Sequence, residues 1–168
     1  LNVSNIIDMK WYKAPEYLGH IKSICYIWQG GMESGNAVAD LLCGKVTPRG
    51  KLTDTIAESL QDYPAFDHFG DEKENCYTED IYVGYRYFET FCPEKVMFEF
   101  GYGLSYTEFT RTVTEAHVTG RGTHAVVEIL VHVKNTGAYK GKEVVQIYVE
   151  APQGKLGKAK RVLCAFKK

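Results

Sequence analysis

The chain has 168 residues, of which 45% are hydrophobic and 24% are charged, and its formal net charge at pH 7 is -1. This hydrophobic content supports a packed core and argues against wholesale disorder. The balanced charge, without a basic stripe or tail, argues against nucleic acid or an anionic membrane surface as a partner. No apolar run approaches the roughly 20 residues that a helix needs to span a bilayer.

The cysteines and histidines do not form a metal-binding pattern. The cysteine count is odd, the spacings are wide and no Cys-x-x-Cys pair occurs, whereas zinc sites usually need close pairs. The five histidines match no metal-ligand spacing either. We therefore expect reduced thiols, no metal and no cofactor, and the free cysteines favour a reducing, cytoplasmic compartment. The cysteines are Cys25, Cys43, Cys76, Cys92 and Cys164.

Both ends of the sequence have the pattern of strands. Leu1, Asn2 and Val3 show neither an initiator methionine nor a signal-peptide pattern, and they are typical of the end of a strand. Residues 161–168 are typical of another strand. We therefore expect the chain to be a fragment of a longer protein.

The first part of the chain is predicted to combine helix and strand. Residues 6–12 favour a short helix or turn. Residues 21–28, with the sequence IKSICYIW, are typical of a strand that is buried on both faces in a parallel sheet. Residues 36–43 have apolar side chains at helical spacing, with Ser34 as the expected N-cap and Gly44 as the expected stop.

A glycine-rich loop, residues 29–35, joins the expected strand to the expected helix. In strand–turn–helix units ligands bind beyond the carboxyl ends of the strands, so Gly31, Met32 and Glu33 are candidates for bordering a cleft. Glu33 is also a candidate acid or base, but glycoside hydrolysis needs two carboxylates and one residue cannot supply both. The loop could instead cradle a phosphate, although it matches neither GxGxxG nor a P-loop, and a tight turn is favoured.

The middle of the chain leads into a segment crowded with aromatic residues. Residues 51–55 are predicted to form a short strand, and the polar residues 57–75 a long surface loop. Residues 79–106, the aromatic strap, combine many tyrosines and phenylalanines with glycines that allow close backbone approach, so we expect the strap to pack two structural units together. Glu79 and Asp80 are adjacent, and neighbouring residues of a strand point to opposite faces, so one shared acidic site is disfavoured. A solvated turn or an inter-domain salt bridge is the favoured interpretation of the two residues.

From residue 107 the apolar pattern changes to a period of two. Short strands are predicted near 113–118, over 125–133 and over 144–149, separated by turn signals. One face of the second strand is expected to carry Val127, Ile129, Val131 and Val133. The spacing is typical of an immunoglobulin-like or fibronectin-like β-sandwich with about half of its strands, so the faces at 127–133 and 145–149 should be partly uncovered.

Three segments, in order, resemble glycoside hydrolase family 3 of the β-glucosidase type. IWQGGMESGNAVADLLCGKVTPRGKL is similar to the pattern W-x-x-G-Q-E-x-G-N-A-x-A-D-V-L-x-G-x-x-N-P-S-G-K-L. EDIYVGYRYFETF with FEFGYGLSYTEF resembles YVGYRYF…FPFGYGLSYTxF, and VKNTGAYKGKEVVQIYV resembles V-x-N-T-G-x-x-x-G-x-E-V-V-Q-x-Y-V. Met32 departs from the pattern, which has glutamine there.

The resemblance implies an α/β domain followed by an all-β domain. Residues 1–78 would be the C-terminal part of an α/β sandwich domain, 79–106 the aromatic strap, and 107–168 the start of a fibronectin III-like domain, an incomplete β-sandwich. Such enzymes remove terminal β-linked glucose or xylose with retention of configuration. Their nucleophile lies in a barrel domain and their acid/base in a segment that has no match here, so we expect no catalytic residue in this chain.

Two function classes follow from these observations. The first is the C-terminal part of a retaining β-glycosidase, inactive by itself, whose partners are a β-glucoside or oligosaccharide and the barrel domain of the same protein. The second is a stand-alone carbohydrate- or protein-binding module, for which Tyr139 and Tyr148 are the main stacking candidates within residues 107–168. A nucleotide-binding domain built on loop 29–35 is disfavoured by its motif and by the lack of a second βαβ unit.

Overall fold

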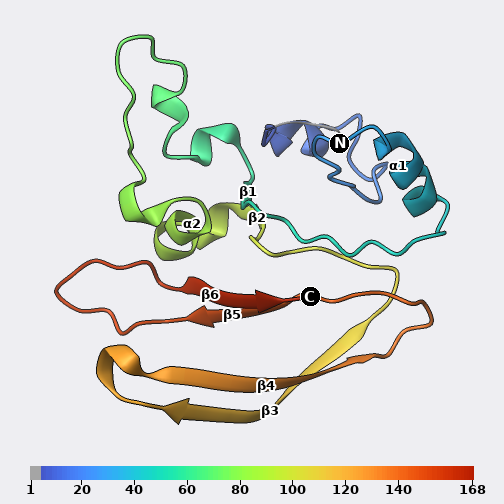
Figure 1. Cartoon of the computed structure of the whole chain (residues 1–168). Helices are drawn as coiled ribbons and strands as arrows, with labels where there is room; N and C mark the ends of the chain where they lie inside the picture. Colours follow the sequence, from blue (N-terminus) through green and yellow to red (C-terminus); the bar gives the residue numbers. More distant parts are fainter. Residues whose placement is uncertain (1–4) are drawn as a thin grey trace.

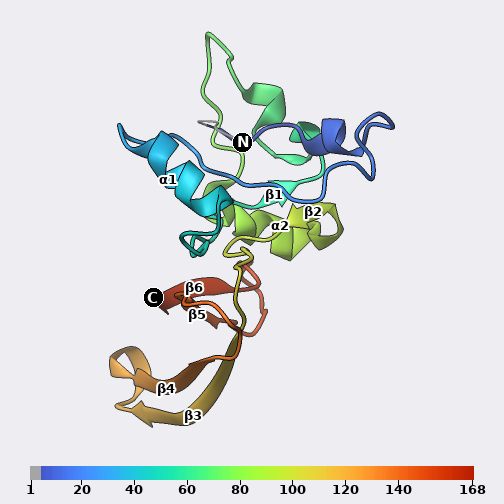
Figure 2. The same cartoon turned by 90° about the vertical axis from the view of Figure 1, so that its right-hand side faces the viewer.

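The computed structural model describes residues 5–168, which form a helix-containing part and two long β-hairpins (Figures 1 and 2). The described elements are the helices α1 (Ser34–Leu42) and α2 (Tyr85–Phe91) and the strands β1 (Ile56–Ala57), β2 (Val96–Phe98), β3 (Phe109–Thr119), β4 (Val126–Asn135), β5 (Val145–Val149) and β6 (Val162–Lys167). The strands make three antiparallel pairs, β1 with β2, β3 with β4 and β5 with β6. Among residues 5–168 no helix has the length and apolar character needed to cross a membrane.

The prediction of a parallel sheet is wrong for the described residues. The expected strand at 21–28 forms no β-structure, and no strand within residues 5–168 pairs with it. A strand exists only through hydrogen bonds to a neighbour, so apolar and β-branched residues alone do not make one. The segment instead packs side chains locally: the Tyr26 hydroxyl lies 3.1 Å from the Met9 sulfur, and the Tyr26 and Trp28 rings are 5.4 Å apart. The expected strand end at Leu1 to Val3 lies outside the described residues.

The first helix is confirmed, with a corrected start. Helix α1 begins at Ser34, two residues before the expected start, so Ser34 lies inside the helix and Glu33 is the N-cap. Gly44 follows the helix with φ of +74°, a left-handed conformation that glycine adopts without strain, and it ends the helix as predicted. The short helix expected at 6–12 is a 3-10 helix, Met9–Lys13, capped by the Asp8 carboxylate.

Between α1 and α2, both the predicted strand at 51–55 and the predicted surface loop at 57–75 differ from the structure. Residues 51–55 form no strand, although Leu52 exchanges two backbone hydrogen bonds with Gly101 and Tyr102. The strand begins one residue after the predicted range, as β1. The expected surface loop at 57–75 begins inside this strand and contains two 3-10 helices, Leu60–Asp62 and Phe66–His68.

The core lies where β1 meets helix α2 of the aromatic strap. Phe88 is fully buried and packs with Ala57 and Cys92, and Tyr63 contacts this cluster. The Tyr63 hydroxyl donates to the Thr55 carbonyl and accepts from the Ala57 N–H, each at 2.9 Å. Burial raises the pKa of Tyr63 to about 12, so the neutral phenol is held as a structural donor.

The aromatic strap is helical where its residues favour strand. Gly84 has φ of +65° and directly precedes α2, and the Tyr85 ring stacks on Phe100 with centroids 4.6 Å apart. Glu79 and Asp80 lie at and just inside a 3-10 helix, Asp80–Tyr82, and not in a strand. Asp80 is exposed there, in agreement with the favoured interpretation of a solvated turn. Tertiary packing of Tyr85 and Phe88 outweighs the intrinsic preference of aromatic residues for strands.

The strands predicted after residue 107 are confirmed: β3 and β4 are longer than expected, and β5 begins one residue later than expected. Val127 and Val131 of β4 share a face as predicted, and they lie opposite Val118 and Val113 of β3, with a register shift between Val113 and Glu115. The expected uncovered faces are also confirmed: Val127 is 58% exposed and Val149 is 52% exposed. Residues 161–168 contain β6.

Candidate functional site

The glycine-rich loop 29–35 lies at the N-terminus of α1, as the sequence predicts. The Gly31 carbonyl accepts the Ser34 N–H at 3.0 Å, and the Glu33 carboxylate accepts the Asn36 side-chain amide at 2.6 Å. A Cβ atom at Gly30 would lie 2.2 Å from the Ser34 Cβ, so only glycine fits there. The tight turn that the sequence favours is thus explained by close packing of Gly30 on the helix.

The three candidate cleft residues are together on this loop and exposed. Gly31, Met32 and Glu33 are all exposed, and a Cβ atom built at Gly31 meets nothing within 4 Å. Glu33 is the one acid of the loop, and hydrolysis of a glycoside requires a second carboxylate at a defined separation. The loop by itself therefore offers a surface that another part of a protein can approach, and its place beside a cleft stays a prediction.

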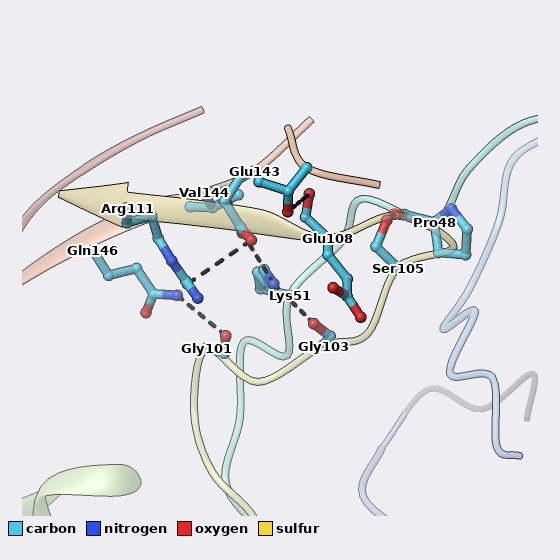
Figure 3. Close-up of polar contacts among 11 residues, drawn as sticks. Pro48, Lys51, Gly101, Gly103, Ser105, Glu108, Arg111, Glu143, Val144 and Gln146 are labelled. Atoms are coloured by element: carbon cyan, nitrogen blue, oxygen red, sulfur yellow. Dashed lines mark hydrogen bonds and ion pairs between the residues drawn. The ribbon is translucent and has the colours of Figure 1, made fainter. Parts of the chain in front are cut away.

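Helix α1 is held at its opposite end by the aromatic strap and by the loop after β4. The Tyr106 hydroxyl donates to the Leu41 carbonyl at 3.0 Å. The Ser105 hydroxyl donates to the Pro48 carbonyl at 2.8 Å, and these two residues lie side by side in Figure 3. The Thr47 hydroxyl donates to the Lys140 carbonyl at 2.9 Å. These contacts join segments more than fifty residues apart and fix the base of the helix that carries loop 29–35.

A charged cluster ties the strap to the two hairpins (Figure 3). The Lys51 ammonium lies 3.1 Å from a Glu143 carboxylate oxygen and donates to the Gly103 carbonyl at 2.8 Å. The Arg111 guanidinium is 3.8 Å from the other Glu143 oxygen, and the Val144 N–H donates to Glu143 at 2.7 Å. The carboxylate is therefore contacted from three directions.

The pKa of Glu143 follows from these partners. Burial disfavours the ionised form, but the Val144 N–H and the Lys51 and Arg111 cations outweigh burial and lower the pKa below its ordinary value. Only 10% of the Glu143 side chain is exposed, so its charge would be costly here without these partners. The cluster acts as a structural anchor that requires the carboxylate.

This anchor gives a pH-dependent prediction. Because the folded-state pKa of Glu143 is depressed, its contribution to stability is present above the unfolded-state pKa and is lost as pH falls through the folded-state pKa. We expect Glu143→Gln to lower the free energy of unfolding by about 1 kcal/mol at pH 7 and to remove part of the acid-induced loss. Urea unfolding at pH 7 and below pH 4 measures both, with Glu150→Gln, an exposed glutamate after β5, as the control. An unchanged acid profile in Glu143→Gln would contradict the prediction.

The cluster borders an open cavity of about 830 Å³ between the strap and the two hairpins. Its walls combine aromatic rings, aliphatic side chains and charges, among them Phe100, Phe109, Val131, Ile147, Tyr148 and Arg161. The Tyr148 ring is already engaged, since the Arg161 guanidinium lies 5.0 Å from its centroid and its hydroxyl donates to Gln146 at 2.7 Å. The cavity is therefore interior surface of the two hairpins that no other strand of residues 5–168 covers.

Sequence reasoning identified the loop but missed the charged cluster. Lys51 and Glu143 are 92 positions apart, and no local periodicity predicts that they meet. A signal was nonetheless present, because Lys51 lies in the first segment that resembles the family pattern and Glu143 in the last.

Residues 1–85 match the sequence model of the Glycosyl hydrolase family 3 C-terminal domain, which is just over half of the chain. The chain belongs to glycosyl hydrolase family 3. The predicted family membership is thereby confirmed. Over its whole length this family 3 chain is 51% identical to a β-glucosidase of Ruminococcus albus, of which it covers 17%. It is 44% identical to β-glucosidase A of Butyrivibrio fibrisolvens, of which it covers 22%.

The chain superposes closely on solved β-glucosidase structures. The chain superposes on a β-glucosidase from Paenibacillus barengoltzii with a TM-score of 0.93 and 58% identity, covering 98% of this chain and 18% of that one. For β-glucosidase 3B from Thermotoga neapolitana in complex with glucose the TM-score is 0.82 at 37% identity, over 99% of this chain and 22% of that one. The family 3 chain thus spans less than a quarter of the length of these relatives.

Proposed function

We propose that this chain forms the C-terminal part of a β-glucosidase, which removes terminal β-linked glucose, or xylose, from a β-glucoside or oligosaccharide with retention of configuration. The observation that carries the proposal is 51% identity over the whole chain to a protein named β-glucosidase. As the family resemblance implies, the nucleophile and the acid/base come from the barrel and the preceding segment of the same protein. Loop 29–35 by itself supplies one acid, whereas the chemistry needs two carboxylates.

The proposal assigns the chain to two domains and a connecting segment. Residues 1–78 complete an α/β sandwich domain, residues 107–168 begin a fibronectin III-like domain, and the aromatic strap, residues 79–106, joins them. Contacts on both sides of the strap support this division. Tyr106 is bonded to the Leu41 carbonyl at the end of α1, and the Tyr85 hydroxyl accepts the Leu163 N–H of β6 at 2.8 Å.

A chimeric enzyme tests the proposal directly. The matching segment of the Ruminococcus albus β-glucosidase is replaced by this chain, and release of an aryl leaving group from an aryl β-glucoside is measured. We expect the chimera to hydrolyse the substrate, and we expect both the enzyme lacking this segment and the isolated chain to release nothing. Turnover by the isolated chain, or a soluble, folded chimera without activity, would overturn the proposal.

The chimera also tests the place of loop 29–35. Gly31 has open space around its Cβ position and no left-handed backbone, so Gly31→Leu should leave the stability of this chain unchanged. If the loop borders the cleft, the added side chain reaches into it, and we expect kcat/KM of the chimera to fall about tenfold or more, or roughly 1.4 kcal/mol of transition-state stabilisation.

The matched control for this substitution is Gly154→Leu. Gly154 also has no neighbour within 4 Å of its Cβ position and lies in the loop between β5 and β6. We expect wild-type kinetics from it. If the Gly31 and Gly154 variants had equal kcat/KM values, the prediction that loop 29–35 borders the cleft would be wrong.

A stand-alone carbohydrate-binding module is the second candidate, and the side chain that favours it is Tyr139. Tyr139 is 61% exposed on the loop after β4, whereas Tyr148 is engaged with Arg161. Titration of the isolated chain with cello- and xylo-oligosaccharides separates the two functions. Saturable binding that Tyr139→Ala abolishes would favour the module.

A further inference from the structure

Trp28 holds a backbone conformation that large side chains rarely adopt. Its φ is +49°, in the left-handed region, and within residues 5–168 Asp80 is the one other non-glycine residue with a positive φ. The left-handed conformation brings the Cβ atom of an L-residue close to the following carbonyl oxygen, which disfavours folding. For a residue as bulky as tryptophan the conformation is an outlier, and such strain persists chiefly where a functional site requires it.

The need for a turn does not explain a tryptophan at this position. Trp28 directly precedes loop 29–35, and its left-handed backbone directs the chain into that loop. Glycine adopts the same backbone conformation without the steric cost, as Gly19 and Gly44 do elsewhere in this chain. The indole ring is therefore kept at the expense of backbone strain, and the ring is the feature that needs a function.

The indole ring rests on a fixed support. The Tyr26 ring lies 5.4 Å from it, tilted by 44°, and the Tyr26 hydroxyl donates to the sulfur of Met9, which is fully buried. Trp28 itself is half-buried and is not part of the buried cluster around Phe88. A ring that is held in place by its neighbours loses little conformational entropy when a ligand stacks on it.

We propose that Trp28 is a substrate-binding residue, whose indole ring stacks on a glucose ring of the β-glucoside or oligosaccharide. The inference rests on the β-glucosidase function proposed above. The hydroxyls of a β-linked glucose ring are equatorial, so its flat faces present C–H groups that an aromatic ring can cover, and the indole N–H can donate to a hydroxyl at the rim. Trp28 is also three residues before Gly31, the first of the residues expected to border the cleft.

Two substitutions in the chimera separate stacking from apolar packing. Trp28→Leu keeps an apolar side chain but has no flat ring, so we expect kcat/KM for cellobiose to fall about tenfold, mainly through a higher KM. Trp28→Phe carries the same backbone strain as Trp28→Leu and keeps a flat ring, so its loss should be no more than about threefold. A role in packing alone would be met as well by leucine as by phenylalanine.

The stability of the 168-residue chain distinguishes a binding residue from a structural one. Trp28→Asn removes the ring and places in the left-handed conformation a residue that tolerates it, so the urea midpoint should not fall. The matched control is Trp11→Asn, because Trp11 is the other tryptophan and is also half-buried against aromatic rings, but has no positive φ. We expect Trp11→Asn to lower the urea midpoint and to leave kcat/KM of the folded chimera unchanged.

The unsubstituted chimera keeps the two proposals distinct. A folded chimera that is inactive before any change at Trp28 would overturn the β-glucosidase function, and the stacking role with it. In an active chimera, equal kcat/KM values for Trp28→Leu and Trp28→Phe would overturn the stacking role alone. A urea midpoint that falls as far in Trp28→Asn as in Trp11→Asn would also overturn it, because the ring would then be a packing element.

Discussion

We expect Phe88→Ala to lower the free energy of unfolding by about 3–5 kcal/mol, which is a large share of the stability of a small domain. The Phe88 ring is fully buried, packs on Ala57 and Cys92, and meets the Tyr63 ring edge-on at 5.2 Å. The other large side chains that are fully buried within residues 5–168 are Met9 and Ile56. Few buried side chains can therefore move into the cavity that the missing ring would leave. Urea unfolding followed by tyrosine and tryptophan fluorescence measures the loss.

Phe69→Ala is the matched control because it removes the same atoms from an exposed position. Phe69 is 87% exposed, so its removal should change the free energy of unfolding by no more than about 0.5 kcal/mol. Similar losses for both variants would show that Phe88 is not a core residue. Such a result would also contradict the prediction that the aromatic strap packs the two structural units together.

Elements with local signals could be predicted from the sequence. Helix α1 has apolar residues at helical spacing and Gly44 at its end, and β4 alternates between Val127 and Val133, so both are correct within one or two residues. Residues 21–28 have an equally clear apolar pattern but form no strand. The difference is that a helix satisfies its own backbone, whereas a strand depends on a partner elsewhere.

Non-local packing also explains the missed helix in the strap. Tyr85 and Phe88 favour strands by intrinsic preference, yet they lie in α2, where one turn directs Tyr85 to β6 and Phe88 to the core. For the candidate site, the sequence located loop 29–35 through its glycines. It did not locate Lys51 and Glu143, because the contact between two single charges leaves no periodic trace.

The second large effect is expected at Arg161, which joins the start of β6 to helix α2. Its guanidinium makes a two-pronged contact with Glu89, with Nη2 at 2.7 Å from Oε1 and Nε bonded to Oε2, and it lies over the Tyr148 ring. The Glu89 side chain is only 14% exposed, so removing the cation leaves a carboxylate poorly solvated and unpaired. Because Arg161 is partly exposed, we expect Arg161→Met to cost about 2 kcal/mol rather than the larger loss of a fully buried pair.

Two comparisons distinguish this contact from ordinary surface charge. Arg161→Lys keeps the charge but loses the planar, two-pronged geometry, so about half of the loss should remain. Lys13→Met breaks an ion pair with Glu58 in which both side chains are 51% exposed, and it should have almost no effect.

A double-mutant cycle measures how strongly Arg161 and Glu89 are coupled. Once Arg161 is removed, Glu89→Gln relieves the unpaired charge, so the double variant Glu89→Gln/Arg161→Met should be more stable than Arg161→Met alone. The coupling free energy should exceed about 1 kcal/mol, whereas independent residues would give additive losses. Additivity would mean that β6 is held to α2 by its backbone contacts alone, through the Tyr85 hydroxyl at Leu163 and the Thr90 hydroxyl at Lys160. Coupling would instead make this side-chain pair the joint through which the C-terminal hairpin and the strap unfold together.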